Sequence, residues 1–116
     1  MRIKINKYLY DALIASKSIL DFVKQKNFND YNEDEMLQSA VERKFEIIGE
    51  SLNRIKQLDE DFLKVNISDA YKIIGFRNIL IHGYDMIDND VVWNAIEKRL
   101  PVLILEIERI LGENDK

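Results

Sequence analysis

The stretch LQSAVERKFEIIGESLNRI, residues 37–55, decides the fold of this 116-residue chain. Its apolar residues recur every three or four positions, which places them on one side of an α-helix. These residues are Leu37, Ala40, Val41, Phe45, Ile48, Leu52 and Ile55. The charged residues of the stretch fall largely outside that stripe. The sequence therefore predicts one long amphipathic helix that needs other helices to cover its apolar side.

The residues just before this stretch indicate where the helix begins. Asn32 is predicted as the N-cap, and Glu35, three residues later, completes a capping box. Tyr31 and Met36 have the spacing of a hydrophobic staple across the same boundary. We expect the helix to start directly after Asn32.

Three further segments are predicted to be helical. The first carries an apolar stripe and ends near Asn27; its members are Ile5, Tyr8, Leu9, Ala12, Leu13, Ile19, Leu20 and Val23. Another follows the acidic interruption LDEDFLKVN, with Ser68 as its N-cap. It is expected to end at Gly83, in the left-handed conformation that glycine adopts readily.

The last predicted helix runs from about residue 90 to residue 111, with Asp88 or Asn89 as its cap. Pro101 lies inside it and should bend or split it, because proline lacks a backbone donor and crowds the preceding turn. The run LPVLIL, residues 100–105, is apolar on nearly every side. It is therefore either central to the fold or covered by another chain.

Composition supports a single all-α domain spanning residues 1–116, folded as an antiparallel four-helix bundle. Apolar residues make up 47% of the chain, and four glycines and one proline leave little material for turns. The absence of cysteine excludes disulfides and thiolate chemistry and is compatible with a reducing cytoplasm. No segment approaches the roughly 20 apolar residues that cross a bilayer. We expect a cytoplasmic protein without membrane contact.

The stretch RNILIHGY, residues 77–84, contains the only histidine of the chain. On a helix, Asn78 and His82 are about 40° apart, and Arg77 and Tyr84 would be about 20° apart if the winding continued. All four side chains can therefore crowd one helix end. A structural explanation is also open, because a histidine in the last turn is favoured by the helix dipole and needs no further role.

Arginine, histidine, asparagine and tyrosine, without a nearby thiol or carboxylate pair, suit phosphoryl transfer without a metal or other cofactor. The arginine would stabilise charge on phosphorus oxygens, and the imidazole would move a proton. RNA supplies its own nucleophile, the 2′-hydroxyl. Because one chain holds one histidine, a homodimer would be needed to supply both a proton acceptor and a proton donor. The net charge of −4 repels nucleic acid overall, so RNA contact must be local.

The segment GFRNILIHGYDMID resembles the signature of the HEPN superfamily, and specifically its HepT-like branch. Arg77, Asn78 and His82 match its Arg-x4-His motif, and Tyr84 extends the match to Arg-x4-His-x-Tyr. RKFEIIGESL and the tail DVVWNAIEKRLPVLILEIERIL also resemble that branch, so the resemblance covers nearly the whole chain.

This resemblance implies a metal-independent endoribonuclease that acts as a toxin, with its cleft at a homodimer interface. Arg77 would stabilise the transition state, His82 would act as general acid or base, and Asn78 would orient the imidazole or the phosphate. The implied partner is a minimal nucleotidyltransferase antitoxin that transfers AMP to Tyr84.

Two readings compete with this one. The same cluster could bind a nucleotide or a partner protein without catalysis, which the acidic overall charge favours. The chain could also be a purely structural dimer, in which Arg77 has no role in any activity.

Overall fold

The chain forms seven helices in the part that the computed structural model describes, residues 2–83 and 87–114. They are α1 (Arg2–Phe22), α2 (Phe28–Asn32), α3 (Glu35–Leu58), α4 (Glu60–Asn66), α5 (Ala70–His82), α6 (Asn89–Lys98) and α7 (Leu100–Asn114). No strand occurs within these ranges, which confirms the all-α prediction. The four predicted helices correspond to α1, α3, α5 and the pair α6 and α7.

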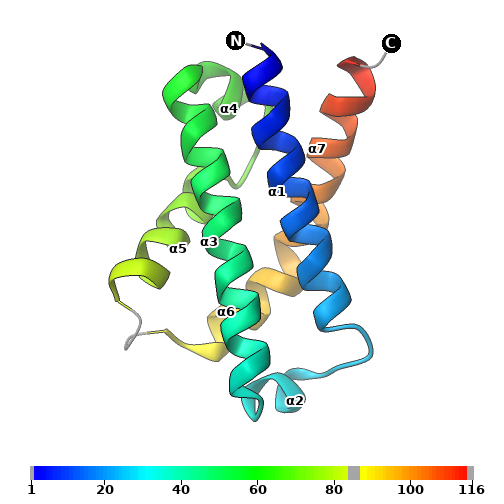
Figure 1. Cartoon of the computed structure of the whole chain (residues 1–116), viewed down its shortest axis with the longest axis vertical. Helices are drawn as coiled ribbons and strands as arrows, with labels where there is room; N and C mark the ends of the chain where they lie inside the picture. The colour runs from blue at the N-terminus through cyan, green and yellow to red at the C-terminus, as the bar shows by residue number, and fades with distance from the viewer. Residues whose placement is uncertain (1, 84–86, 115–116) are drawn as a thin grey trace.

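The long helices pack side by side along the 43 Å axis of the molecule (Figure 1). α1 packs against α3 on one side and α7 on the other, while α5 lies across α3. α1 runs opposite to both neighbours, so the described chain begins and ends at the same end of the bundle. This arrangement leaves α5 at the edge of the bundle, in contact with α3.

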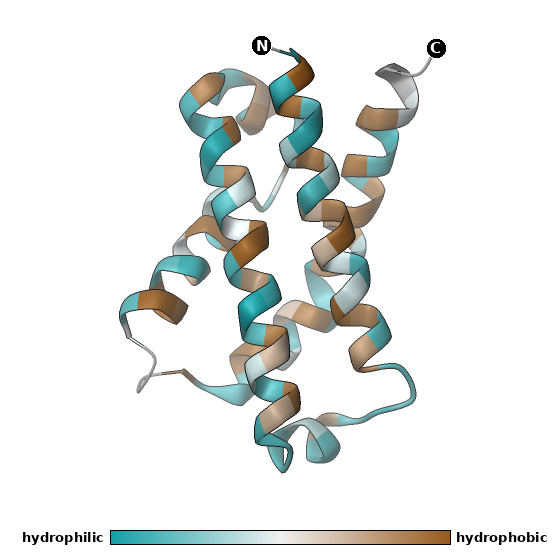
Figure 2. Cartoon of the chain, viewed as in Figure 1, coloured by the Kyte–Doolittle hydropathy of each residue, from teal (hydrophilic) through white to brown (hydrophobic). Residues whose placement is uncertain are grey.

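Hydrophobic burial follows the predicted stripes. On α3 the buried apolar residues are Leu37, Val41, Phe45, Ile48, Leu52 and Ile55, and Ala40 is half-buried. The stripe of the first predicted helix is buried except at Leu20, which is exposed, and at Tyr8 and Val23, which are half-buried. The predicted end near Asn27 is wrong, because α1 ends at Phe22 and Val23 already lies in the turn that follows. Apolar and polar bands accordingly alternate along both helices (Figure 2). Removing this apolar surface from water is the main force that holds the bundle together.

The predicted start of the long helix is wrong by two residues. Asp34, not Asn32, caps α3, with its carboxylate accepting a hydrogen bond from the backbone N–H of Leu37 at 3.0 Å. The reason is that Asn32 ends an additional short helix, α2, which begins with a capping box between Asn27 and Asp30. The staple is also wrong: Tyr31 is buried against Trp93, with ring centroids 5.5 Å apart, while Met36 is exposed.

The two ends of α5 differ from prediction as well. The acidic segment before it forms α4, capped by Asp59, and α5 begins at Ala70 with Asp69 at the N-cap position. Ser68 is not the cap; its backbone N–H donates instead to the carboxylate of Glu106, at 3.1 Å. Gly83 does follow the last residue of α5, but its φ of −130° is not left-handed.

The last predicted helix is split, as its proline indicated. Asp88 caps α6, and Arg99 separates α6 from α7, so that Pro101 falls in the first turn of α7, where its missing N–H costs nothing. Within residues 100–105, Leu100, Leu103 and Ile104 are buried in the core. The run is therefore largely central, although Val102 and Leu105 remain exposed.

Candidate active site around Arg77

Arg77 lies where α5 crosses α3, and a glycine makes room for it. A Cβ atom added to Gly49 would lie 2.2 Å from Cβ of Arg77 and 2.8 Å from its Cγ. Carbon atoms do not approach that closely, so a side chain at position 49 would push α5 away. Gly49 therefore sets both the distance between the two helices and the position of the Arg77 stem.

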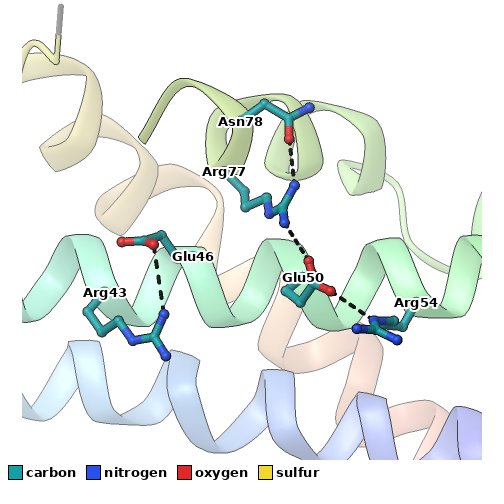
Figure 3. Close-up of polar contacts among 6 residues, drawn as sticks. All are labelled: Arg43, Glu46, Glu50, Arg54, Arg77 and Asn78. Carbon is teal, nitrogen blue, oxygen red and sulfur yellow. Dashed lines mark hydrogen bonds and ion pairs between the residues drawn. The ribbon is translucent and has the colours of Figure 1, made fainter. Parts of the chain in front are cut away.

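Two hydrogen bonds hold the guanidinium group of Arg77 (Figure 3). Its Nη2 atom lies 2.6 Å from Oε2 of Glu50 on α3, and its Nη1 atom donates to Oδ1 of Asn78 at 2.8 Å. The side chain is only 24% exposed, and its Nε atom is buried without a hydrogen-bond partner in the described part of the chain. Arg77 is thus a largely fixed cation with its guanidinium end accessible.

Glu50 is shared between two arginines. Its Oε1 atom accepts a hydrogen bond from Nε of Arg54 at 2.8 Å, while Oε2 faces Arg77. The hydrogen bond to Glu50 also raises the pKa of Arg54 above its ordinary value. Two cations and one anion leave the cluster with a net charge of +1.

This cluster forms part of the wall of an open cavity of about 400 Å³ between α1, α3 and α5. The wall contains three arginines and three carboxylates, together with four uncharged residues: Arg43, Arg54, Arg77, Asp11, Glu46, Glu50, Tyr8, Ile47, Ser51 and Ile81. Formal charges on the wall therefore cancel. A phosphate would be attracted by the local charge around Arg77 and not by the cavity as a whole.

His82 is the last residue of α5, and its side chain is exposed. Five residues at 100° each place it about 140° around the helix from Arg77. It is absent from the cavity wall, and no hydrogen bond or ion pair joins it to any residue in the described ranges. The structure brings Arg77 and Asn78 together, but it leaves His82 separate within one chain.

The expectation that four motif residues crowd one end of α5 therefore holds only in part. Asn78 contacts Arg77 rather than the imidazole, although Asn78 and His82 are both exposed on α5. Tyr84 lies outside the described residues. The sequence reasoning missed Gly49, Glu50 and Arg54; the one available signal was a glycine in the middle of a strongly amphipathic helix.

Two other kinds of site are not found in the described ranges. No group of three or more histidine, cysteine, aspartate or glutamate side chains there could hold a metal ion. Of the helices described, none combines the length and the apolar character needed to span a membrane.

Comparison with known proteins identifies relatives over nearly the whole chain. Residues 12–110 match the family described as "Ribonuclease HepT-like". "Putative RNase MJ0127" of Methanocaldococcus jannaschii is 34% identical over 110 residues, which cover 94% of this chain and 88% of that protein. "Probable ribonuclease HepT" of Thermococcus cleftensis is 31% identical over 104 residues, which cover 89% and 92% of the two chains.

No solved structure gives a significant match. The family match extends over α3, α5 and the motif that begins at Arg77, and it confirms the resemblance drawn from that motif. The chain belongs to the Ribonuclease HepT-like family.

Proposed function

We propose that this protein is a metal-independent endoribonuclease whose active cleft forms between two copies of the chain. The observation that carries the proposal is the setting of Arg77. A guanidinium group has five N–H donors; in Arg77 one faces Glu50, one bonds to Asn78, and the one on Nε is buried. Two donors therefore remain for the oxygens of a phosphodiester.

RNA supplies both the nucleophile and the leaving group for cleavage beside Arg77. The 2′-hydroxyl attacks the adjacent phosphorus and loses its proton to one imidazole, while the 5′-oxygen of the next nucleotide leaves with a proton from a second imidazolium. Arg77 stabilises the charge that develops on the non-bridging oxygens. The products are a 2′,3′-cyclic phosphate and a 5′-hydroxyl. Both proton transfers are assigned to His82, one in each copy of the chain.

Exposed apolar residues beside His82 support a second copy at this place. Ile79 is 50% exposed and Ile81 is 39% exposed, and both lie within three residues of His82 on α5. Val91, near the start of α6, is also exposed. A second chain that covered this surface would bury apolar area and bring a second imidazole to the cleft.

A regulatory role is proposed for Tyr84, two residues after His82. In this part of the proposal, the protein is the toxin of a toxin–antitoxin pair, and a nucleotidyltransferase antitoxin transfers AMP from ATP to the tyrosine hydroxyl, releasing pyrophosphate. The added phosphate would carry negative charge next to the motif and would compete with RNA for Arg77. Modification would therefore switch cleavage off.

RNA with a single 2′-deoxynucleotide tests the cleavage chemistry. We expect the protein to cut the all-ribose RNA at a preferred bond, to leave a 2′,3′-cyclic phosphate, and to leave that bond intact when its 2′-hydroxyl is missing. A His82→Ala preparation, purified in parallel, controls for contaminating nuclease. Cutting at the deoxy position, or equal cutting by the variant, contradicts the proposal.

The modification is tested by intact mass after coexpression with a candidate nucleotidyltransferase. A mass increase of one or more AMP units in the wild-type chain, absent from Tyr84→Phe, supports the assignment. An increase of the same size in Tyr84→Phe places the modification elsewhere and contradicts it.

The balance of charge in the cavity favours one alternative, a module that binds a nucleotide or a partner protein and does not catalyse. Three carboxylates opposite three arginines are unusual for a surface that holds a polyanion. Such a module never cuts RNA under any condition, whereas the proposed enzyme cuts only next to a 2′-hydroxyl.

A further inference from the structure

We propose that Glu50 is a positioning residue for Arg77. We also propose that Arg54 offsets the negative charge of Glu50, so that the cluster keeps a net positive charge for the substrate. This inference rests on the proposed ribonuclease function and adds two residues to its machinery. It starts from the contact of one carboxylate with two arginines, which reach it from different helices (Figure 3).

Glu50 is the only contact from α3 that fixes the direction of the Arg77 guanidinium through a hydrogen bond in the described part of the chain. The other hydrogen bond of that group is donated to Oδ1 of Asn78, its neighbour on the same helix, which moves when Arg77 moves. Nε is buried and adds no hydrogen bond. The orientation of the two free N–H groups toward the cavity therefore depends on Glu50.

A carboxylate at 2.6 Å also carries a cost, because it neutralises the charge that a phosphate needs. Arg54 offsets this cost. It lies one helical turn after Glu50 and bonds to the other carboxylate oxygen, so the cluster stays at +1. Arg54 is 54% exposed, so it can hold Glu50 without closing the cavity.

Kinetics of three variants measure the two roles. Glu50→Gln should lower kcat about tenfold with little change in KM, because a neutral amide orients the guanidinium less firmly in the transition state. Arg54→Ala should also lower kcat several-fold, because Glu50 then neutralises Arg77 alone. In the Glu50→Gln background, Arg54→Ala should have almost no further effect, since no carboxylate remains to be offset.

The matched control is Glu108→Gln. Glu108 on α7 pairs with Lys17 on α1 at 3.0 Å, so this variant removes an inter-helix carboxylate of similar exposure away from Arg77. Its kcat should equal that of the wild type. Faster cleavage by Glu50→Gln would show that Glu50 competes with substrate, and additive effects of Glu50→Gln and Arg54→Ala would show that the two act separately. Either result overturns the inference.

A second readout does not depend on activity. In ¹⁵N-edited NMR of the full chain, the guanidinium N–H signals of Arg77 should be resolved, as expected for restricted rotation, and should collapse in Glu50→Gln but not in Glu108→Gln. Unresolved signals in the wild type, or no change in Glu50→Gln, overturn the positioning role. If the signals respond as expected and the wild type does not cut RNA, the ribonuclease function fails while the positioning contact stands.

Discussion

Arg77 and His82 are five residues apart on one helix but lie in two different settings. Arg77 faces α3, where Gly49 makes room for its stem and Glu50 holds its guanidinium. His82 lies in the last turn of α5, exposed and without a hydrogen bond to the described residues. A single chain thus fixes Arg77 and leaves the side chain of His82, the proposed proton carrier, exposed. This difference supports the proposal that one chain forms half of a site and that a second copy completes it.

The largest expected effect is the loss of RNA cleavage when His82, at the exposed end of α5, is changed. His82→Ala should reduce RNA cleavage about 10²–10⁴-fold, the usual cost of removing a general acid or base. The melting temperature should change little, since the residue is exposed and has no hydrogen bond or ion pair to the described residues. Cleavage rates and thermal unfolding of the same preparation check both points, and a large loss of stability would mean that His82 has a structural role.

Arg77→Ala should affect both RNA cleavage and stability. Cleavage should fall about 10²–10³-fold, as for the loss of one donor to a developing oxyanion. The free energy of unfolding should also fall, by roughly 1 kcal/mol, because the stem leaves its contact with α3 and Glu50 keeps one partner in place of two. Arg77→Lys keeps the charge but not the planar fork, and it should restore stability better than activity. Arg109→Ala, at an exposed position on α7, serves as the control for both measurements.

Two glycine-to-alanine variants compare the side of α5 that faces α3 with its outer side. Gly49 lies on α3 against Arg77, and Gly75 lies on α5 itself. Gly49→Ala should lower the free energy of unfolding by about 1–3 kcal/mol and reduce cleavage, because the new methyl group overlaps Arg77. Gly75→Ala on α5 has no atom within 4 Å of its added Cβ and should raise stability by about 0.5–1 kcal/mol. Denaturant unfolding of both variants measures these shifts. Equal shifts in the same direction would contradict the close approach of α3 and α5.

The smallest effect concerns Glu42, a carboxylate on α3 that forms no ion pair with an arginine in the described part of the chain. Burial, and secondarily the negative charge of Glu46, raise the pKa of Glu42. The folded state then binds a proton more tightly than the unfolded state, so this group lowers stability as the pH rises from the unfolded pKa through the raised folded pKa. Glu42→Gln should therefore unfold at a slightly higher temperature than the wild type at pH 7. Below about pH 3 the two should unfold alike, because Glu42 is then protonated in both states. A gain that persists at low pH would have another cause.

Sequence patterns predicted the long helices because each buries one continuous apolar stripe. The pattern gave no sign of α2 and α4, which have five and seven residues and so carry too few turns for a periodicity to appear. Missing α2 then shifted the predicted cap of α3 from Asp34 to Asn32. The error at Gly83 has a different origin, since a glycine after a helix permits the left-handed conformation without requiring it.

The candidate site was predictable only where it lies within one helix. Arg77, Asn78 and His82 lie within six residues of one another on α5, so the family motif that they match could be read directly from the sequence. Glu50 and Arg54 lie more than twenty residues earlier, and apart from the adjacent Gly49 nothing in their own neighbourhood distinguishes them from other charged residues of α3. Their role depends on how α3 and α5 cross, which is a property of the packed fold.

Heterodimers of one wild-type chain and one His82→Ala chain test most directly whether two copies share one cleft. Two different affinity tags isolate them, and a doubly tagged wild-type dimer is the reference. A shared cleft that needs both imidazoles predicts a cleavage rate close to that of the His82→Ala homodimer. A rate near half that of the wild type, or failure to recover any dimer from a preparation that cuts RNA, would show that each chain works alone.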